Sequence, residues 1–461
     1  MSTELRLLST FLYMVSLALA PRVTSGRDWH RQKGASDVQV IRSAEAVRVT
    51  SSSMRMDLDL HRGLVSLRWG TQREVRGTTC GVTLSDGTKL KASEYAAHVC
   101  APTDVETVQD GFGVGTRLRI HHRQEGRPEL RQTLWIYRDA PAVYVQLEVI
   151  NATPIASNRI SPLLVEAGTA AGIELDAGDP LQVLFVPFDN DMFVRYNSHD
   201  WGPQADSFEV TAFYDNHSRH GFVFGSVSHD LWKTGFAIRN IGKQQVGALD
   251  IYGGASGYWS HDTQPHGTIT ARVITSPRIF VGWFADWRDG MEAFGKANAV
   301  LTPPLKWSGG VPFGWNSWAA HKDKVTAEQV VAASDFLKQT LQPHGFESDH
   351  TAFINMDAFW DFIPADKFTQ AVAHIHANGQ KAGVYWTPFT GWGDDLNSEV
   401  EGTQGRYKYK DIVLKDAQGR PMAKLDNGWP LDPTHPGTRM RNDLHFQRFL
   451  AWGFDFVKLD L

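Results

Sequence analysis

The chain has 461 residues, of which 42% are hydrophobic and 21% are charged, with 41 Gly and 21 Pro. This length exceeds one small core, and at about 150 residues per domain it predicts roughly three domains. The balance is typical of a folded protein and excludes disordered, collagen-like and coiled-coil classes. A net charge of −5 offers no positive field for phosphates, which argues against nucleic-acid binding. The 16 Trp residues are unusually many, and indole faces suit stacking on sugar rings as well as filling cores.

The N-terminus has the pattern of a secretory signal. Arg6 precedes an apolar stretch over residues 7–20, which ends in the small-residue pattern Ala18-Leu19-Ala20. Because Pro21 is unfavourable just after a cleavage site, we expect residues 1–25 to form the signal, with the cut near Ser25. The stretch is short for a bilayer, and no later segment approaches ~20 apolar residues, so no membrane span is expected. The prediction is a secreted or periplasmic protein; an N-terminal anchor or a disordered leader is the alternative.

Cysteine and histidine provide little evidence of a metal. Export would permit a disulfide between the two cysteines, Cys80 and Cys100, and two free buried thiols are the equal alternative. Neither has the spacing of a metal site, and the 18 His residues show no His-x-x-x-His pattern. We expect no metal and no cofactor, and the sequence leaves the oligomeric state open.

The first part of the chain has the two-residue period of β-strands. In the segment 142–150, the alternate positions Val143, Val145, Leu147 and Val149 are apolar, as in a half-buried strand. Similar segments, separated by turn residues, lie at 53–60, 64–69, 114–121, 132–137, 221–227, 268–274 and 279–283. Many strands without intervening helices predict two packed antiparallel sheets, an unusually large β-sandwich (a supersandwich) over residues 38–283.

After Trp283 the pattern changes to alternating strands and helices. Residues 284–306 form a linker with one helix at 286–300, which ends before Pro303-Pro304. A capping box, Thr326 with Gln329, opens a helix over 326–341. Further helices are expected at 364–378 and 438–452, and strands at 311–316, 351–357, 381–386 and 454–460. This order is typical of parallel βαβ units.

Four strands and three helices over residues 307–461 are half of a (β/α)8 TIM barrel, a fold that needs about 250 residues. Half a barrel would leave an unpaired strand edge. We therefore expect the sequence to be part of a longer protein. An open doubly wound sheet is the alternative, but Asn316-Ser317-Trp318 stands where that fold has a glycine-rich phosphate-binding turn.

In TIM barrels the reactive groups lie at the C-terminal ends of the strands. Carboxylates and aromatic rings suit a neutral polyhydroxylated ligand. Lys458 and Asp460 are two residues apart on a strand and point to the same side, so the ammonium favours the ionised carboxylate. Asp460 is thus a candidate nucleophile, and a structural ion pair is the alternative. The strand ends hold Trp315, Asn316, Trp318, Asp357, Trp360, Tyr385, Trp386, Lys458 and Asp460.

Four motifs, in order, resemble the α-galactosidase (melibiase) superfamily, clan D of the glycoside hydrolases. They are Gly314-Trp315-Asn316-Ser317-Trp318, Phe353-Ile354-Asn355-Met356-Asp357, Gly379-Gln380-Lys381-Ala382-Gly383-Val384-Tyr385 and Trp452-Gly453-Phe454-Asp455-Phe456-Val457-Lys458-Leu459-Asp460. A large β domain before the barrel resembles family 36. The resemblance implies a retaining hydrolase or galactosyl transferase for terminal α-galactosides, with an oligosaccharide or glycoside as substrate.

The resemblance also implies roles for single residues. Asp460 would be the nucleophile and Lys458 a sugar-contacting neighbour. Asp357 would bind hydroxyls on the C4 and C6 side, Trp318 would form a wall beside them, and Tyr385 would line the subsite. The acid/base aspartate of the superfamily comes from a later strand, so we expect residues 1–461 alone to be inactive. A non-catalytic carbohydrate-binding protein is the alternative function.

Three features leave the specificity open. Many superfamily members have two successive aspartates where this sequence has Asp357-Ala358, so one hydroxyl acceptor is absent and the preference for galactose is uncertain. The Gly- and Asp-rich loop 388–436 either reshapes the pocket or is a surface excursion; it carries Trp392, Asp394, Asp395 and Trp429. Polar turns at 189–191 and 200–201 either reach the barrel mouth or are ordinary turns.

Overall fold

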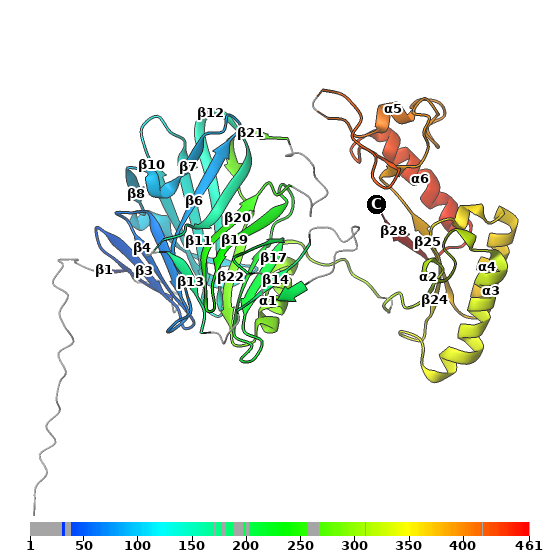
Figure 1. Cartoon of the computed structure of the whole chain (residues 1–461), viewed down its shortest axis with the longest axis horizontal. Helices are drawn as coiled ribbons and strands as arrows, with labels where there is room; N and C mark the ends of the chain where they lie inside the picture. The colour runs from blue at the N-terminus through cyan, green and yellow to red at the C-terminus, as the bar shows by residue number, and fades with distance from the viewer. Residues whose placement is uncertain are drawn as a thin grey trace, which may run out of the picture. The chain divides into compact units, whose positions relative to one another are not determined.

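The computed structural model describes residues 30–32, 38–168, 171–176, 181–187, 197–199, 202–256, 267–308, 310–416 and 418–460. The chain divides into two compact units, Met1–Pro304 and Leu305–Leu461 (Figure 1). The expected signal at 1–25 and the polar turns at 189–191 and 200–201 lie outside the described residues. Among the helices that are described, none is long and apolar enough to cross a membrane.

The first unit consists of antiparallel strands in two layers that share one long strand, β12 (Ala142–Val165). One layer contains, in pairing order, β9 (Val105–Asp110), β10 (Gly113–Arg123), β11 (Glu129–Tyr137), the first half of β12, β22 (Ile279–Phe284), β18 (Gly221–Ser226), β17 (Val210–Tyr214), β14 (Gln182–Phe185) and β15 (Asn197–His199). Beside these, β8 (Ala97–Val99) pairs with β10, and β21 (Ile269–Thr275) pairs with β12.

The other layer begins near the N-terminus. It contains, in pairing order, β1 (His30–Gln32), β2 (Gln39–Arg42), β3 (Ala46–Thr50), β4 (Arg55–Asp59), β5 (Leu64–Arg68), β6 (Glu74–Leu84), the second half of β12, β20 (Gln245–Gly253), β19 (Thr234–Ile241) and β16 (Gln204–Phe208). In addition, β7 (Lys89–Lys91) pairs with β6, and β13 (Gly172–Glu174) pairs with both β6 and β20.

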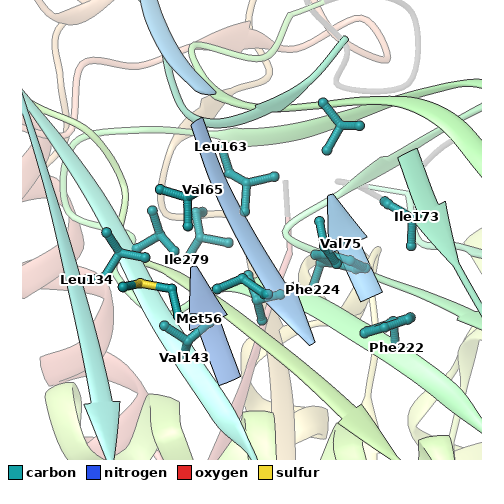
Figure 2. Packing of buried hydrophobic residues seen from close by; sticks show 14 of the residues in the cluster. Met56, Val65, Val75, Leu134, Val143, Leu163, Ile173, Phe222, Phe224 and Ile279 are labelled. Carbon is teal, nitrogen blue, oxygen red and sulfur yellow. The ribbon is translucent and has the colours of Figure 1, made fainter. Parts of the chain in front are cut away.

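The core lies between these layers. Strand β4 buries every second residue, and its Met56 belongs to one apolar cluster with Val143, Phe222 and Ile279 of the opposite layer (Figure 2). Alternate side chains of a strand point to opposite faces of its sheet. The apolar positions of the two-residue period therefore point inward from both layers and fill the space between them. The first unit is therefore a two-layer antiparallel sandwich.

Strand β12 is much longer than the predicted segment 142–150. Its first half pairs with β11 and β22, and its second half pairs with β6 and β20. The register shifts between Ile150 and Ile155 and again between Ser157 and Arg159. These irregularities bend the strand from one layer into the other and accommodate Pro154, which a regular central strand would exclude.

The predicted helix after the sandwich is α1 (Trp287–Leu301), and it belongs to the first unit. Its N-cap is Asp286, whose side chain accepts a hydrogen bond from the backbone N–H of Arg288. The helix packs against β18 and β22. Gly225 makes this packing possible, because a Cβ there would collide with the ring of Phe294. The helix is part of the sandwich domain's surface.

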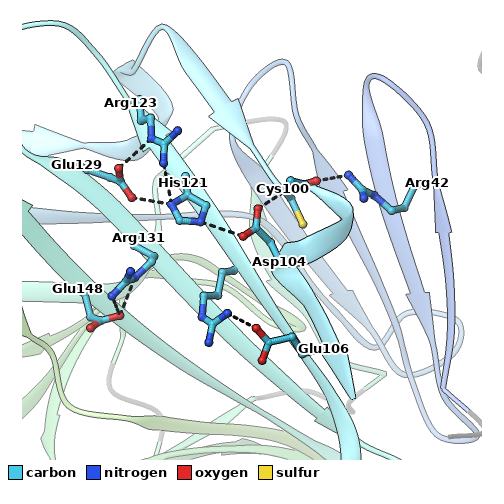
Figure 3. A network of polar contacts seen from close by, with 11 residues as sticks. Arg42, Cys100, Asp104, Glu106, His121, Arg123, Glu129, Arg131 and Glu148 are labelled. Carbon is cyan, nitrogen blue, oxygen red and sulfur yellow. Dashed lines mark hydrogen bonds and ion pairs between the residues drawn. The ribbon is translucent and has the colours of Figure 1, made fainter. Parts of the chain in front are cut away.

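Strand β10 separates two neighbouring histidines onto opposite faces. His121 bonds to Glu129 (2.6 Å) and Asp104 (3.2 Å) in a cross-strand network (Figure 3). His122 points inward, and its Nδ1 lies 2.8 Å from Nδ1 of His98. Partly exposed ion pairs contribute at most about 1 kcal/mol each. The network around His121 therefore adds a little stability at the surface. The pair of His122 and His98 is a polar contact inside the domain.

The two cysteines are free and buried. Cys80 lies in β6, and Cys100 follows β8. Burial raises the pKa of the Cys100 thiol to about 11, so this thiol is neutral at physiological pH. Of the two alternatives for the cysteines, the structure has free thiols.

The second unit has a four-stranded parallel sheet in the order β23 (Gly314–Asn316), β24 (Phe353–Met356), β25 (Lys381–Trp386) and β28 (Phe456–Leu459). These are the four predicted strands; β25 has the predicted bounds, and the other three are each shorter by three residues. The connections contain α2 (Trp318–His321), α3 (Ala327–Phe336), α4 (Ala365–Ala377) and α6 (Pro436–Ala451), and short 3-10 turns at Lys322–Lys324 and Trp360–Phe362. Closure of such a sheet into a barrel stays a prediction.

Helix α3 begins at the predicted capping box. The Thr326 hydroxyl accepts from the N–H of Gln329, and the Gln329 side chain accepts from the N–H of Thr326. The expected single helix to 341 instead becomes a π-helical turn at Leu337–Leu341, followed by a 3-10 turn at Gln342–His344. Pro343 explains the change, because its ring lacks an N–H and clashes with the carbonyl four residues earlier.

Residues 388–436, called the insertion below, are folded rather than an irregular loop. Strand β26 (Thr390–Gly391) pairs with β27 (Trp429–Pro430), and α5 spans Tyr409–Ile412. The insertion has its own apolar cluster, built on Val400, Ile412, Val413 and Leu431. Arg441 of α6, only 3% exposed, donates to the carbonyls of Thr387 and Thr390. The insertion is therefore fixed to the end of β25.

Candidate active site

The C-terminal ends of β24 and β28 bring together one ammonium and two carboxylates. Asp357 directly follows β24, Lys458 lies in β28, and Asp460 directly follows β28. Lys458 Nζ lies 3.0 Å from Asp357 Oδ2 and 3.3 Å from Asp460 Oδ2. Lys458 and Asp460 share one side of their strand, as the two-residue period predicts.

Asp357 is the buried member of this cluster. Its side chain is 2% exposed. Besides Lys458, its carboxylate accepts hydrogen bonds from Asn316 Nδ2 (2.6 Å) and from the backbone N–H of Ala358 (2.8 Å). A buried carboxylate needs such compensation, because it has lost its water. The donors fix the position of the Asp357 side chain, which in turn orients Lys458.

Lys458 and Asp460 are the open part, with side chains 37% and 34% exposed. In the parallel register Tyr385 of β25 is the partner of Lys458, and Lys458 Nζ lies 5.0 Å from the centre of the Tyr385 ring. The backbone N–H of Asp460 donates to the carbonyl of Trp386 at 3.1 Å. The sheet thus fixes the backbone beside Asp460, while a ligand in solvent has access to its side chain.

Trp318 lies at the start of α2 and is 42% exposed. Its ring stacks on Phe359, with centres 6.1 Å apart and planes 11° apart. Its backbone N–H donates to Asn316 Oδ1. Because Asn316 also bonds to Asp357, one amide links the backbone of Trp318 to the buried carboxylate.

The other three tryptophans that the sequence placed at strand ends lie elsewhere. Trp360 is buried in the core beneath the helices, and its Nε1 donates to the carbonyl of Tyr385. Trp386 stacks on His445 of α6, with ring centres 3.9 Å apart. Trp315 lines a cavity of about 460 Å³ beside α3, with apolar neighbours such as Phe336 and Leu341. Strand alternation turns Trp315 and Trp386 away from the carboxylates.

Sequence reasoning missed two residues on the polar side of the sheet. Ser317 is buried, and its hydroxyl accepts from the backbone N–H of Asp357 at 2.9 Å. Asn355 is 6% exposed, and its amide has no hydrogen-bond partner among the described residues. Gly383 leaves room for that amide, since a Cβ there would lie 2.5 Å from Asn355 Oδ1. The available signal was spacing: Asn355 precedes Asp357 by two residues and so shares its face.

Chemically, this arrangement combines an accessible carboxylate, an ammonium beside it and aromatic rings nearby. The described residues contain no group of three or more His, Cys, Asp and Glu side chains that could hold a metal ion. The cluster carries one positive and two negative charges, and its open carboxylate can act as a nucleophile or as a hydrogen-bond acceptor.

No known protein family matches the sequence, and no curated protein matches it. Solved structures do match in fold. An α-galactosidase from Lactobacillus brevis has a TM-score of 0.53 at 10% identity, over 94% of this chain and 64% of that chain. A β-arabinopyranosidase has a TM-score of 0.53 at 11% identity, over 88% and 60%. An α-N-acetylgalactosaminidase from Bifidobacterium bifidum has a TM-score of 0.51 at 11% identity, over 90% and 70%.

The chain shares the fold of these glycosidases. The match to the Lactobacillus enzyme spans 64% of that enzyme's length, a little under two thirds. At identities of 10 to 11% the likeness concerns the fold, and three different sugars appear in the names of the three neighbours. Function therefore has to be argued from the site itself.

Proposed function

We propose that this chain carries the sugar-binding and nucleophilic part of a retaining glycoside hydrolase of the α-galactosidase superfamily, acting on terminal α-galactosides. The observation that supports this most directly is the Lys458 ammonium, 3.0 Å from buried Asp357 and 3.3 Å from open Asp460. Lys458 and Asp460 occupy the motif positions where the superfamily resemblance implies a sugar contact and a nucleophile. Carboxylates at the carboxyl ends of parallel strands are typical of enzyme sites on such sheets.

The reaction would proceed by two displacements. A carboxylate oxygen of Asp460 attacks the anomeric carbon, the bond to the leaving oxygen breaks, and that oxygen takes a proton from a carboxylic acid. Water, or the hydroxyl of an acceptor sugar, then attacks the same carbon, gives up its proton and releases Asp460. Attack by water is hydrolysis, and attack by a sugar hydroxyl is galactosyl transfer.

Asp357 is poorly suited to donate the proton, because three hydrogen-bond donors surround its carboxylate. The superfamily resemblance assigns the acid to a later barrel strand. Activated glycosides, whose leaving group needs no proton, are therefore the substrates with which the nucleophile can be tested by itself.

Substrate recognition would involve both parts of the cluster. Lys458 is exposed enough to donate to a sugar hydroxyl while Asp357 holds it in place. Asp357 accepts two of its hydrogen bonds at Oδ2 and one at Oδ1, so a sugar hydroxyl that reached it would donate to Oδ1. Because Ala358 replaces a second aspartate, N-acetylgalactosaminides, β-L-arabinopyranosides and glucosides are the alternative substrates.

Covalent labelling tests the nucleophile. The chain is incubated with a 2-deoxy-2-fluorogalactosyl fluoride, and the mass of the intact protein and of its peptides is measured. We expect one glycosyl adduct on Asp460 and none in the Asp460→Asn variant. Asp443→Asn, an exposed carboxylate on α6, is the matched control and should label normally.

The same experiment separates catalysis from simple binding. A non-catalytic carbohydrate-binding protein would bind galactose equally well with Asp460→Asn and would never acquire the label. That outcome would overturn the proposal that the protein is an enzyme, but it would agree with a protein that binds a carbohydrate.

We also propose that the protein is exported, on the strength of the N-terminal signal pattern. Mass spectrometry of the mature protein from its native host is expected to show cleavage near Ser25. An intact N-terminal Met1 would contradict export by this route.

A further inference from the structure

The insertion presents a tryptophan that is fixed on one side and open on the other. Trp392 follows β26 and is 48% exposed. Its Nε1 donates to the hydroxyl of Thr387 at 2.9 Å. Because the ring N–H is already bonded within the chain, the indole offers a ligand its flat face rather than a donor.

A tight turn at residues 425–428 packs against one side of the Trp392 indole. Leu425 and Gly428 exchange backbone hydrogen bonds of 2.9 and 2.7 Å, and Asp426 and Asn427 between them have φ values of 45° and 69°. These are the features of a type I′ turn, for which Asn is favourable. A Cβ on Gly428 would lie 2.2 Å from Cγ2 of Thr390 and 3.2 Å from Cζ3 of Trp392, so glycine lets β26 and the ring approach the turn closely. The turn and the Thr387 hydroxyl thus hold the ring on one side.

The insertion starts at the same strand ends as the candidate nucleophile. Thr387, which holds the indole, directly follows Trp386, and the Trp386 carbonyl accepts the backbone N–H of Asp460. Figure 1 shows the insertion (orange) beyond the end of β28. Trp392 is thus tied to the backbone of the candidate site through two hydrogen bonds and one peptide link.

The surroundings of Trp392 combine apolar and charged groups. Asp394, two residues after Trp392, has a side chain 94% exposed and pairs with Lys424, whose ammonium lies 5.0 Å from the centre of the Trp429 ring. Four further apolar side chains of the insertion are exposed: Phe389, Leu414, Met422 and Leu425. An exposed indole face, with an exposed carboxylate two residues along the chain, suits a sugar better than a wholly apolar partner.

We propose that Trp392 is a stacking platform for the leaving-group sugar of an oligosaccharide substrate. The proposal rests on the proposed function, because it places the terminal galactose beside Asp460 and the next sugar on the indole. Trp392 is then a specificity residue that favours oligosaccharides over simple galactosides and does not take part in bond breaking.

Calorimetric titration of the full chain with galactose and with raffinose, a trisaccharide that ends in α-galactose, tests the platform. We expect raffinose to bind more tightly than galactose. Trp392→Ala should weaken raffinose about 3- to 10-fold, the contribution of one aromatic contact, and leave galactose within twofold. Trp392→Phe should recover part of the loss. Trp307→Ala, which removes another exposed indole, is the matched control and should change neither affinity.

A second variant covers the case in which Trp392→Ala disturbs the insertion. Gly428→Ala keeps the indole but places a Cβ 2.2 Å from Thr390 Cγ2 and 3.2 Å from the ring, so it shifts the end of β26 that carries Trp392 and should weaken raffinose alone. Equal losses for both sugars, or no loss of raffinose affinity, would overturn the platform. In that case a loss of galactose binding in Asp357→Asn would leave the proposed function standing, whereas wild-type chain that binds neither sugar would overturn both.

Discussion

Lys458 neutralises a carboxylate that has almost no access to water. Replacing it by Met would leave Asp357 buried with two neutral donors and a second carboxylate nearby. Loss of one partner from a buried pair costs several kcal/mol, and the half-exposed ammonium reduces this, so Lys458→Met should destabilise the second unit by about 1–3 kcal/mol. Urea unfolding followed by fluorescence measures the change.

A surface ion pair provides the comparison for Lys458. Lys367 pairs with Glu328, and both side chains are more than half exposed. Lys367→Met should change the unfolding midpoint little, because water and salt already screen that pair. Equal effects of the two variants would show that Asp357 does not depend on Lys458.

The buried histidine pair of the first unit predicts sensitivity to acid. Burial, with the nearby His98, lowers the pKa of His122 to about 3, and burial also lowers the pKa of His98. Since the unfolded chain takes up these protons near pH 6.5, stability is full above that pH and falls as the pH drops toward 3. For His122 alone the expected loss is about 2–3 kcal/mol between pH 7 and pH 4.

Urea midpoints measured from pH 8 to pH 4 check this slope. His122→Gln keeps a hydrogen-bonding group beside His98 but cannot be protonated, so its midpoint should fall less with acid. His217→Gln, an exposed histidine of the same unit, should keep the wild-type slope. A wild-type slope in His122→Gln would refute the role of this pair.

At the scale of elements, β12 depends on one hydroxyl at the bend between its two halves. Ser157 is fully buried, its hydroxyl donates to the carbonyl of Thr83 at 2.7 Å, and it accepts the N–H of Arg159 at 3.1 Å. Ser157→Ala removes both hydrogen bonds inside the protein and should destabilise the sandwich by about 1–2 kcal/mol. Thermal unfolding compared with Thr153→Ala, an exposed hydroxyl of the same strand, measures the cost, and equal melting temperatures would contradict it.

Periodicity predicted most elements because the buried face repeats within each one. The four parallel strands, the capping box at Thr326 and α6 lie where their own residues indicated. The continuation of β12 past Pro154 was not predictable, since its second half is stabilised by pairing with β6 and β20 and not by local preference. The insertion was missed for the same reason, as β26 and β27 are two residues each.

Some features of the candidate site could likewise be predicted from the sequence, and others could not. The proximity of Asp357, Lys458 and Asp460 followed from the rule that parallel strands end together. Strand alternation sets the faces on which Trp315 and Trp386 lie, but the helices that cover those faces are recorded in no short motif. Ser317 acts through a bond to a backbone N–H forty residues away, and composition gives no sign of it.

At the scale of the whole molecule, each unit has apolar clusters of its own. We expect calorimetry to show two unfolding transitions. His122→Gln and Ser157→Ala should shift the transition of the first unit, and Lys458→Met that of the second. A single transition that all three variants shift together would show that the units unfold as one.

The strand shared by the two layers also affects how the protein is synthesised. Strand β12 pairs with β6, which precedes it in the sequence, and with β20 and β22, which follow it by many residues. The sandwich therefore cannot close until Phe284 has left the ribosome, and until then its early strands have exposed edges. Nascent chains of this kind fold slowly, because their contacts join distant residues, and they are clients for chaperones that cover unpaired strands.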